Sequence, residues 1–468
     1  MLQVALVHAA AHPIACLISV RTTFPTVLQL KYHAMRLAAT ATESSSAALS
    51  PSIAKAKRII FLFMHGGPST LDLFDPKESL KKNNGKPLPY DKPRIVSSKT
   101  GNLLASPWNF KQYGQSGAWV SELLPNISSI TDDLCFLHSM HCSNSRHGGA
   151  LLELHTGSDT FTRPAMGSWI NYGLGSENNN LPGFITINPP SSHGGSGAWS
   201  SAFLPPRYGG TMIRGNSKEM KIPFINNPLT DRSKQRKEID LLNALNQEHL
   251  TKHKFNSDLE SRIESYELAF RMQMTAPEIQ DISAEPAHIN ELYGADEKPT
   301  AEFAKQCIMA RRLSESGVRF VQVTHRYWDS HGNLRAEHEK LSKEMDKPVA
   351  GLITDLKQRG MFDETLILWG GEFGRTPVAE FPNLNGRDHN HYGFSVWMAG
   401  GGIKGGTVYG ATDDFGFRAV DKPTSVHDLH ATMLHLLGLD HERLTYRYAG
   451  RDFRLTDVHG HVIHDIIA

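Results

Sequence analysis

The sequence has few cysteines, no surplus of either charge and no long apolar run beyond its N-terminus. Its four cysteines include no close pair at metal-site spacing and do not form a disulfide framework, so they leave the redox compartment open. Lys and Arg number 49 against 48 Asp and Glu, and no basic excess supports nucleic-acid binding. No later stretch reaches the roughly 18 uncharged apolar residues of a membrane span. We therefore expect neither a nucleic-acid partner nor an integral membrane segment.

The N-terminal segment differs from the rest of the chain. Met1–Val20 is apolar enough for the central region of an export signal, and the Ala- and Ser-rich stretch 37–50 resembles a linker or processing region. We predict that residues 1–53 are a signal-like or linker-like segment and that the folded domain covers 54–468. A periplasmic or extracellular location is expected.

Four short apolar runs have the pattern of buried strands. They are rich in β-branched or aromatic residues, are apolar in the middle and end in polar residues or Gly, which is typical of buried parallel strands. They cover residues 58–64, 319–325, 365–371 and 394–401. Helical patterns lie among them at 300–316, 341–356 and 425–437. This alternation predicts an α/β fold, with a central, mostly parallel sheet covered by helices on both faces.

The stretch 216–273 is different, because it is rich in Lys, Glu and Leu and has helical periodicity with few Gly. We expect a helical insertion at about 216–298.

The chain is rich in His, with 24 of them, and in Gly, with 39. Several His and acidic residues cluster at the ends of the predicted strands, where ligands gather in α/β sheets. These candidate ligands are His65, Asp329, His331, Glu372, Asp388, His389 and His391. A single His after a strand is more often a hydrogen-bonded loop residue, but the short spacings 329–331 and 388–391 favour two ligands for one ion. The sequence predicts a divalent-metal site, with zinc, calcium and manganese all open.

A further polar cluster, residues 142–149, lies between two apolar runs and has the pattern of a loop that enters a helix. A helix N-terminus there would attract an anion and lower the pKa of a nucleophile such as Cys142. Arg146 would bind a sulfate or phosphate oxygen. We expect Cys142, Arg146 and His147 to be catalytic; ordinary N-capping by the polar residues 143–145 is the alternative.

Several of these segments together resemble the domain-of-unknown-function 1501 family. The blocks that carry the resemblance are 65–77, 139–157, 167–175, 181–184, 328–333, 371–377 and 386–391. They occur in order from about Ala54 to the C-terminus. The family is similar to sulfatases and to other members of the alkaline phosphatase superfamily. That similarity implies an alkaline-phosphatase-like α/β fold and a one- or two-metal site that cleaves phosphate or sulfate esters.

The resemblance also implies roles for individual residues. One ion would be held by Asp329, His331 and one of His389 or His391. His65 stands where the superfamily has a strand-end Asp, and Glu372 stands near its second-metal Asp. Phe373, beside Glu372, stands where the superfamily usually has His or Asn.

The loop that contains Cys142 resembles the Cys-x-Pro-Ser-Arg segment of sulfatases, whose cysteine matures to formylglycine. Cys142, Ser145 and Arg146 match that segment, and Asn144 replaces its proline. The nucleophile is then Cys142, its formylglycine form, or a water activated at the metal.

These expectations favour a metal-dependent hydrolase that acts on a small-molecule or glycan sulfate or phosphate ester. The first alternative is a non-catalytic protein that uses the same scaffold to bind sulfated or phosphorylated glycans. The second is a transferase similar to phosphoglycerate mutase.

Overall fold

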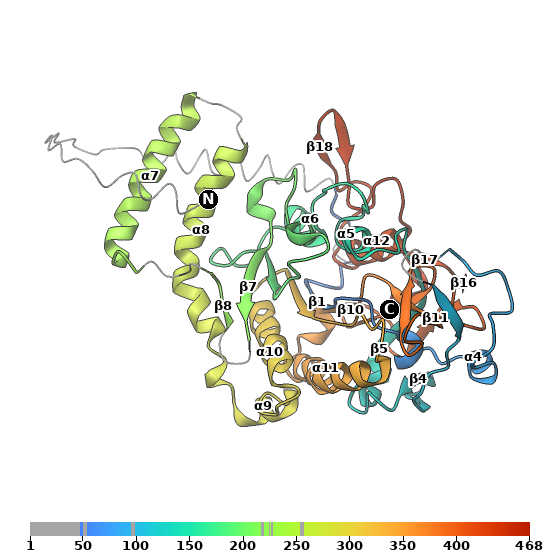
Figure 1. Ribbon diagram of the computed structural model, residues 1–468. Helices are drawn as coiled ribbons and strands as arrows, with labels where there is room; N and C mark the ends of the chain where they lie inside the picture. Colours follow the sequence, from blue (N-terminus) through green and yellow to red (C-terminus); the bar gives the residue numbers. More distant parts are fainter. Residues whose placement is uncertain are drawn as a thin grey trace, which may run out of the picture. The chain divides into compact units, whose positions relative to one another are not determined.

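A ten-stranded sheet forms the centre of the fold (Figure 1). Nine strands lie side by side in the order β14 (Thr407–Tyr409), β5 (Leu134–His141), β13 (Phe394–Ala399), β10 (Thr365–Gly370), β1 (Arg58–Met64), β9 (Phe320–His325), β6 (Phe184–Ile187), β7 (Thr211–Gly215) and β8 (Met220–Lys221). The tenth strand, β17 (Thr424–Ser425), pairs with β5.

The computed structural model describes residues 47–49, 54–94, 99–216, 220–223, 225, 228–252 and 257–468. The predicted export segment, 1–53, lies outside this range apart from 47–49. Within the described residues, no helix has both the length and the apolar character needed to cross a membrane.

Most neighbouring strands of the sheet are parallel. Strand β1 pairs in parallel with β10 and β9, and β6 pairs in parallel with β9 and β7. The prediction that the run 394–401 is a parallel strand is wrong, because β13 is antiparallel to both β10 and β5. An apolar run carries no information about strand direction. The start of β13, rather than its end, therefore lies at the edge where β10 and β5 end.

Strand β1 shows why the sheet is covered on both faces. Ile60, Leu62 and Met64 belong to one hydrophobic core, and Ile59, Phe61 and Phe63 belong to a second core. Successive side chains of a strand point to opposite faces, so a continuous apolar run needs cover on both sides.

Each core is completed by helices. The first contains residues of α10 (Ala301–Glu315) and α11 (Leu334–Gln358). The second contains residues of α5 (His147–Thr156), α6 (Met166–Leu174) and α12 (Val426–Leu436). The two groups lie on opposite sides of the sheet in Figure 1. The predicted α/β fold, with a large, mostly parallel sheet and helices on both faces, is confirmed.

The segment 216–298 contains α7 (Arg232–Lys252), α8 (Ser257–Gln280) and α9 (Ala287–Tyr293). Whether these helices are a separate insertion stays a prediction. Two short helices, α3 (Thr70–Leu73) and α4 (Glu78–Lys82), follow β1.

Smaller sheets surround the central one. A three-stranded sheet is formed by β12 (Arg387–Asn390), β11 (Gly374–Glu380) and β2 (Thr100–Leu103). Three hairpins are formed by β3 (Phe110–Tyr113) with β4 (Ala118–Ser121), β15 (Ala411–Thr412) with β16 (Ala419–Asp421), and β18 (Tyr446–Tyr448) with β19 (Arg451–Phe453).

Candidate metal centre

Three segments that are distant in the sequence bring four potential metal ligands together. Asp329 and His331 lie in the loop between β9 and α11, His147 is the first residue of α5, and His389 lies on β12. One ligand atom of each residue lies within 4.8 Å of the ligand atoms of the others. We call this group the His₃Asp cluster.

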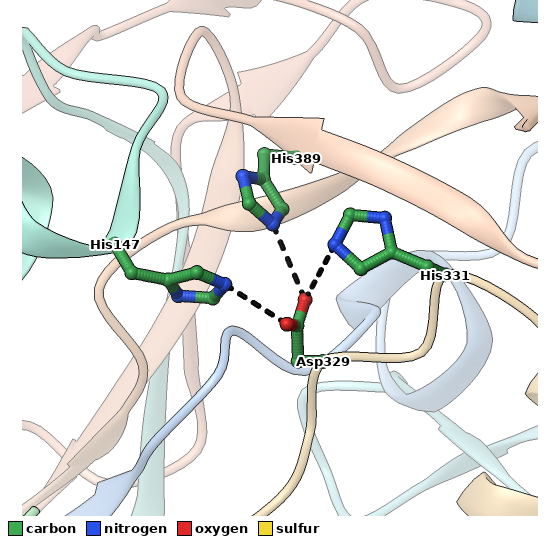
Figure 2. Close-up of side chains that lie close together, drawn as sticks. All are labelled: His147, Asp329, His331 and His389. Atoms are coloured by element: carbon green, nitrogen blue, oxygen red, sulfur yellow. Dashed lines mark hydrogen bonds and ion pairs between the residues drawn. The ribbon is translucent and has the colours of Figure 1, made fainter. Parts of the chain in front are cut away.

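The three histidines all face the Asp329 carboxylate (Figure 2). His331 Nε2 and His389 Nε2 lie 2.9 and 3.2 Å from Asp329 Oδ1. His147 Nε2 lies 3.1 Å from Asp329 Oδ2. Three imidazoles and one carboxylate converging on one point are a ligand set suited to zinc and related divalent ions.

The second ring nitrogen of each histidine is held by a hydrogen-bond acceptor. Nδ1 of His147 lies 2.7 Å from Glu372 Oε1, and Nδ1 of His331 lies 2.5 Å from Glu380 Oε2. Nδ1 of His389 lies 2.8 Å from the carbonyl oxygen of Ser145. Such partners fix the ring orientation and place the proton on Nδ1, which leaves the Nε2 lone pair for a metal.

This tautomer provides a test of whether a cation fits. A carbonyl oxygen only accepts hydrogen bonds, so the His389 ring donates from Nδ1 to Ser145 and a neutral ring has a lone pair on Nε2. That lone pair faces a carboxylate oxygen, which is also an acceptor. Moreover, the buried His147 Nε2 lies 3.1 Å from Asp329 Oδ2 but is not aligned for a hydrogen bond to it. A divalent cation between these atoms would satisfy all of them, and the donor set therefore fits a metal.

Arg375 holds the loops of the site together. Its buried guanidinium donates to the carbonyl oxygens of Gly66 and Gly67, which follow β1, and to that of Arg387 on β12. It also donates to Asp329 Oδ1 at 2.6 Å. One side chain therefore fixes the relative positions of three segments and orients the central carboxylate.

Phe373 forms an apolar wall of the His₃Asp cluster. Its ring stacks on His389 at a centroid distance of 4.3 Å and lies 4.9 Å from the ring of His147. The chain reverses beside it at Gly67, which has a φ of +79°, and a Cβ there would lie 2.6 Å from the Phe373 ring. Only glycine meets both requirements without strain.

The His₃Asp cluster is buried on one side and open on the other. The side chains of His147 and His389 are 9% and 7% exposed, whereas those of Asp329 and His331 are each 36% exposed. A ligand from solvent therefore approaches from the side of Asp329 and His331.

Residues 56–467 match the family described as Protein of unknown function (DUF1501). The chain belongs to this family. No curated protein sequence matches the chain.

Solved structures with similarity to this DUF1501 protein include sulfatases and phosphatases. The PsFucS1 sulfatase from Pseudoalteromonas sp. shares 12% identity over 89% of this chain and 72% of its own, with a TM-score of 0.34. The alkaline phosphatase of the Antarctic bacterium TAB5 shares 9% identity over 82% of this chain and 98% of its own, with a TM-score of 0.35. Ps i-CgsB, solved with k-i-k-neocarrahexaose, shares 12% identity over 82% of this chain and 73% of its own, with a TM-score of 0.36.

The electrostatics of the DUF1501 site keep its carboxylates ionised. Burial would raise the pKa of Asp329, but the three adjacent histidine rings and the charge of Arg375 hold it far below its usual range. Burial would also raise the pKa of Glu372, whereas His147 and His65 lower it overall. Ionised carboxylates are the form that binds a metal or orients a ligating imidazole.

The structure separates the predicted ligands into two groups. Asp329, His331 and His389 belong to the His₃Asp cluster, whereas His65, Glu372, Asp388 and His391 do not. Glu372 instead contacts His147 and accepts from the backbone N–H of Gly66.

Asp388 and His391 lie outside the His₃Asp cluster for different reasons. Neighbouring residues of β12 point to opposite sides, so Asp388 and His389 cannot present side chains to the same point. Asp388 forms a separate group with His331 and Glu380. His391 lies beyond the end of β12, and its ring packs on Tyr392 at 3.9 Å.

His65 is near the His₃Asp cluster without being part of it. Its ring centroid lies 6.3 Å from that of His147 and 5.8 Å from that of His193. Its Nε2 is buried and has no hydrogen-bond partner among the described residues.

The environment of Cys142 differs from the one predicted for a nucleophile. Its thiol is buried and lies 3.5 Å from the carbonyl oxygens of Asn144 and Glu372. Burial, together with the charge of Glu153, raises its pKa well above the usual value. The expectation that the helix N-terminus lowers this pKa is wrong, because the thiol lies five residues before His147 in an apolar setting. A buried, protonated thiol is a poor nucleophile.

Arg146 is exposed and directly precedes His147; its anion-binding role stays a prediction. No side chain caps the N-terminus of α5. Asn144 Oδ1 accepts from the backbone N–H of Arg146, outside the helix. The alternative of ordinary N-capping by residues 143–145 is therefore not what the structure shows.

Three groups that hold the site were missed as site residues. Glu380, Arg375 and the carbonyl of Ser145 all act on the histidines or on Asp329. The sequence offered one signal, because Arg375 lies in the same short polar block as Glu372. Glu380 lies at the end of β11, and a backbone carbonyl has no sequence signature.

Proposed function

We propose that this protein is a metal-dependent hydrolase of sulfate or phosphate esters that binds one divalent cation, zinc, at Asp329, His147, His331 and His389. The observation that supports this most is the convergence of three histidine Nε2 atoms on the Asp329 carboxylate. The Nδ1 atom of each of these histidines is hydrogen-bonded to Glu372, Glu380 or the carbonyl oxygen of Ser145. A bound zinc ion would polarise an ester oxygen and lower the pKa of a bound water.

The chain's own residues would bind and orient the anionic group. Arg146 is exposed at the N-terminus of α5, where the helix dipole and the first N–H groups also favour an anion. Its guanidinium, directly before His147, would bind oxygens of the sulfate or phosphate. Phe373 would keep water away from the buried side of His147 and His389. The ester then enters from the open side of the His₃Asp cluster.

The proposal does not use Cys142 as the nucleophile. Its thiol is buried, has a raised pKa and is not part of the His₃Asp cluster. A water-based reaction without a covalent cysteine intermediate fits these properties better.

We also propose that the protein acts in the periplasm or outside the cell. The apolar segment Met1–Val20 supports this location. Fractionation of cells that express the full chain tests it: the protein is expected in the periplasmic or culture fraction, and recovery in the cytosol alone contradicts it.

The hydrolytic activity is tested with 4-nitrophenyl sulfate and 4-nitrophenyl phosphate, using zinc-loaded protein. Wild type is expected to hydrolyse at least one of them, and His331→Ala to lose at least about a hundredfold in kcat/KM. His288→Ala, a histidine exposed on α9, is the matched control and should keep wild-type activity. A protein that binds zinc yet cleaves neither ester contradicts the hydrolase and favours the binding scaffold.

A further inference from the structure

A closed ring of hydrogen bonds lies buried beside the His₃Asp cluster. Its members are Ser69, Asp72, Ser330, His338 and Arg387, each of which is 0% exposed. We propose that these residues, which we call the buried ring, position the metal ligands, and that His338 does so through the hydroxyl of Ser330. The inference rests on the metal site of the proposed function and adds to it the residues that set its affinity for zinc.

The buried ring joins two of the segments that carry ligands. Ser330 lies between the ligands Asp329 and His331. Arg387 is the first residue of β12, the strand that carries His389. The backbone N–H of Arg387 donates to the carbonyl oxygen of Ser330 at 3.1 Å. The position of His389 relative to the other two ligands therefore depends on this link.

The side chain of Arg387 is fixed by Asp72. Its Nε and one Nη donate to the two carboxylate oxygens of Asp72 at 2.8 and 3.1 Å. Its other Nη donates to the carbonyl oxygen of Thr376 on β11, and Ser69 Oγ donates to Asp72 at 2.5 Å. A bidentate pair of this kind has a fixed geometry, and it holds the start of β12 against α3.

His338, on α11, closes the buried ring on the other side of Ser330. The backbone N–H of Ser69 donates to His338 Nε2 at 3.2 Å, so this nitrogen is an acceptor and the imidazole has its proton on Nδ1. Nδ1 lies 3.3 Å from Ser330 Oγ and therefore donates to this hydroxyl. Ser330 is thus held at two atoms, its hydroxyl by His338 and its carbonyl oxygen by Arg387.

Two tryptophans hold the imidazole of His338 in place. It stacks on Trp108 at a centroid distance of 6.0 Å and lies edge-on to Trp328 at 5.3 Å. His338 is not a member of the His₃Asp cluster, so it acts on the ion only through Ser330. It is therefore a positioning residue, and its removal should change the affinity for zinc without removing a ligand.

Two substitutions of His338 separate its two hydrogen bonds. In His338→Asn the amide nitrogen stands at the position of Nδ1 and keeps the bond to Ser330. In His338→Gln the amide oxygen stands at the position of Nε2 and keeps the bond to Ser69. Zinc affinity is measured by competition with a chromophoric chelator. We expect His338→Gln to weaken zinc binding by about tenfold or more and His338→Asn to stay within about threefold of wild type.

The stability of the two variants should change in the opposite order. Asn is smaller than Gln and leaves a larger cavity between the two tryptophans, so His338→Asn should be the less stable variant in denaturant unfolding of the zinc-free protein. If His338 only supported the fold, the loss of zinc affinity would follow the loss of stability. Weaker zinc binding in the more stable variant therefore indicates positioning.

Ser330 allows a second test with a smaller change. Ser330→Ala removes only the hydroxyl to which His338 donates, and it should weaken zinc binding about as much as His338→Gln does. The double variant should lose no more than either single variant, because both substitutions remove the same hydrogen bond. Losses that add up in the double variant would overturn the inference.

His138→Gln is the matched control. His138 is buried on β5, and its Nδ1 also lies close to a serine hydroxyl, 2.8 Å from Ser395 Oγ. It does not belong to the buried ring, so the control should lose stability and bind zinc like wild type. The inference is also overturned if His338→Gln binds zinc like wild type, if His338→Asn binds it more weakly than His338→Gln, or if the control loses as much affinity.

The zinc assay separates this inference from the proposed hydrolysis. If wild type binds zinc and the variants rank as expected while no ester is cleaved, the buried ring is supported and the hydrolase fails. If the protein cleaves esters and both His338 variants bind zinc like wild type, the inference fails and the proposed function stands. A wild-type protein that binds no zinc overturns both.

Discussion

Glu380 offers the sharpest test of how the metal centre is built. Its Oε2 lies 2.5 Å from Nδ1 of His331, on the side of the ring away from Asp329. Glu380→Gln keeps an acceptor of similar size but removes the charge, and Glu380→Ala removes both. A hydrogen bond to a charged group contributes about 1.5–3 kcal/mol. We therefore expect Glu380→Gln to weaken zinc binding about tenfold and Glu380→Ala about a hundredfold.

The assay is competition for zinc against a chromophoric chelator at constant pH. Glu364→Gln, a surface carboxylate with a side chain that is 43% exposed, is the control and should bind zinc like wild type. If Glu380 were itself a ligand, both Glu380 variants would lose far more than a hundredfold. Zinc affinities within twofold of wild type for both variants would show that Glu380 does not support His331, and the reasoning about the Nδ1 partners would be refuted.

Three further predictions concern stability, positioning and the nucleophile. Burial lowers the pKa of His430 from 6.5 to about 3, so the unfolded chain takes up this proton at a higher pH than the folded protein does. The free energy of unfolding therefore falls as the pH drops below 6.5, and at pH 5 this residue should account for a loss of about 2 kcal/mol in denaturant unfolding. The loss should disappear in His430→Gln. Gly386→Ala would place a Cβ 2.2 Å from the carbonyl of His331 and should lower zinc affinity at least tenfold. At Gly148 a Cβ would meet no atom within 4 Å, so Gly148→Ala should instead stabilise α5 by about 0.5–1 kcal/mol in thermal unfolding. Cys142→Ala should retain ester hydrolysis within about threefold of wild type, and mass spectrometry of the wild-type peptide should find an unmodified thiol; formylglycine at this position would contradict the account.

The fold was predictable because its strongest signals are local. Strand β1 is a continuous apolar run, and such a run requires cover on both faces wherever it lies in the chain. Helix α12, at the predicted helical pattern 425–437, begins with a capping box in which the side chains and backbone N–H groups of Ser425 and Asp428 satisfy each other. The direction of β13 could not be predicted, because the pairing of a strand depends on segments that are remote in the sequence.

The candidate site was predictable only where its residues are close in sequence. Asp329 and His331 were found from their spacing, and both belong to the His₃Asp cluster. His147 was predicted as a catalytic residue, but its contact with Asp329 depends on where α5 packs against the sheet. The choice between His389 and His391 could not be made from the sequence; the structure places His389 on β12 and in the cluster, whereas His391 lies beyond the end of that strand.

The most direct test of the central claim is the zinc stoichiometry of the purified full chain, measured by elemental analysis after equilibration with zinc and removal of the excess. The account predicts one zinc ion per chain for wild type and the loss of tight binding in Asp329→Asn, because this carboxylate is the point on which His147, His331 and His389 converge. A wild-type protein that retains no divalent ion, or an Asp329→Asn variant that retains zinc as tightly as wild type, would contradict it.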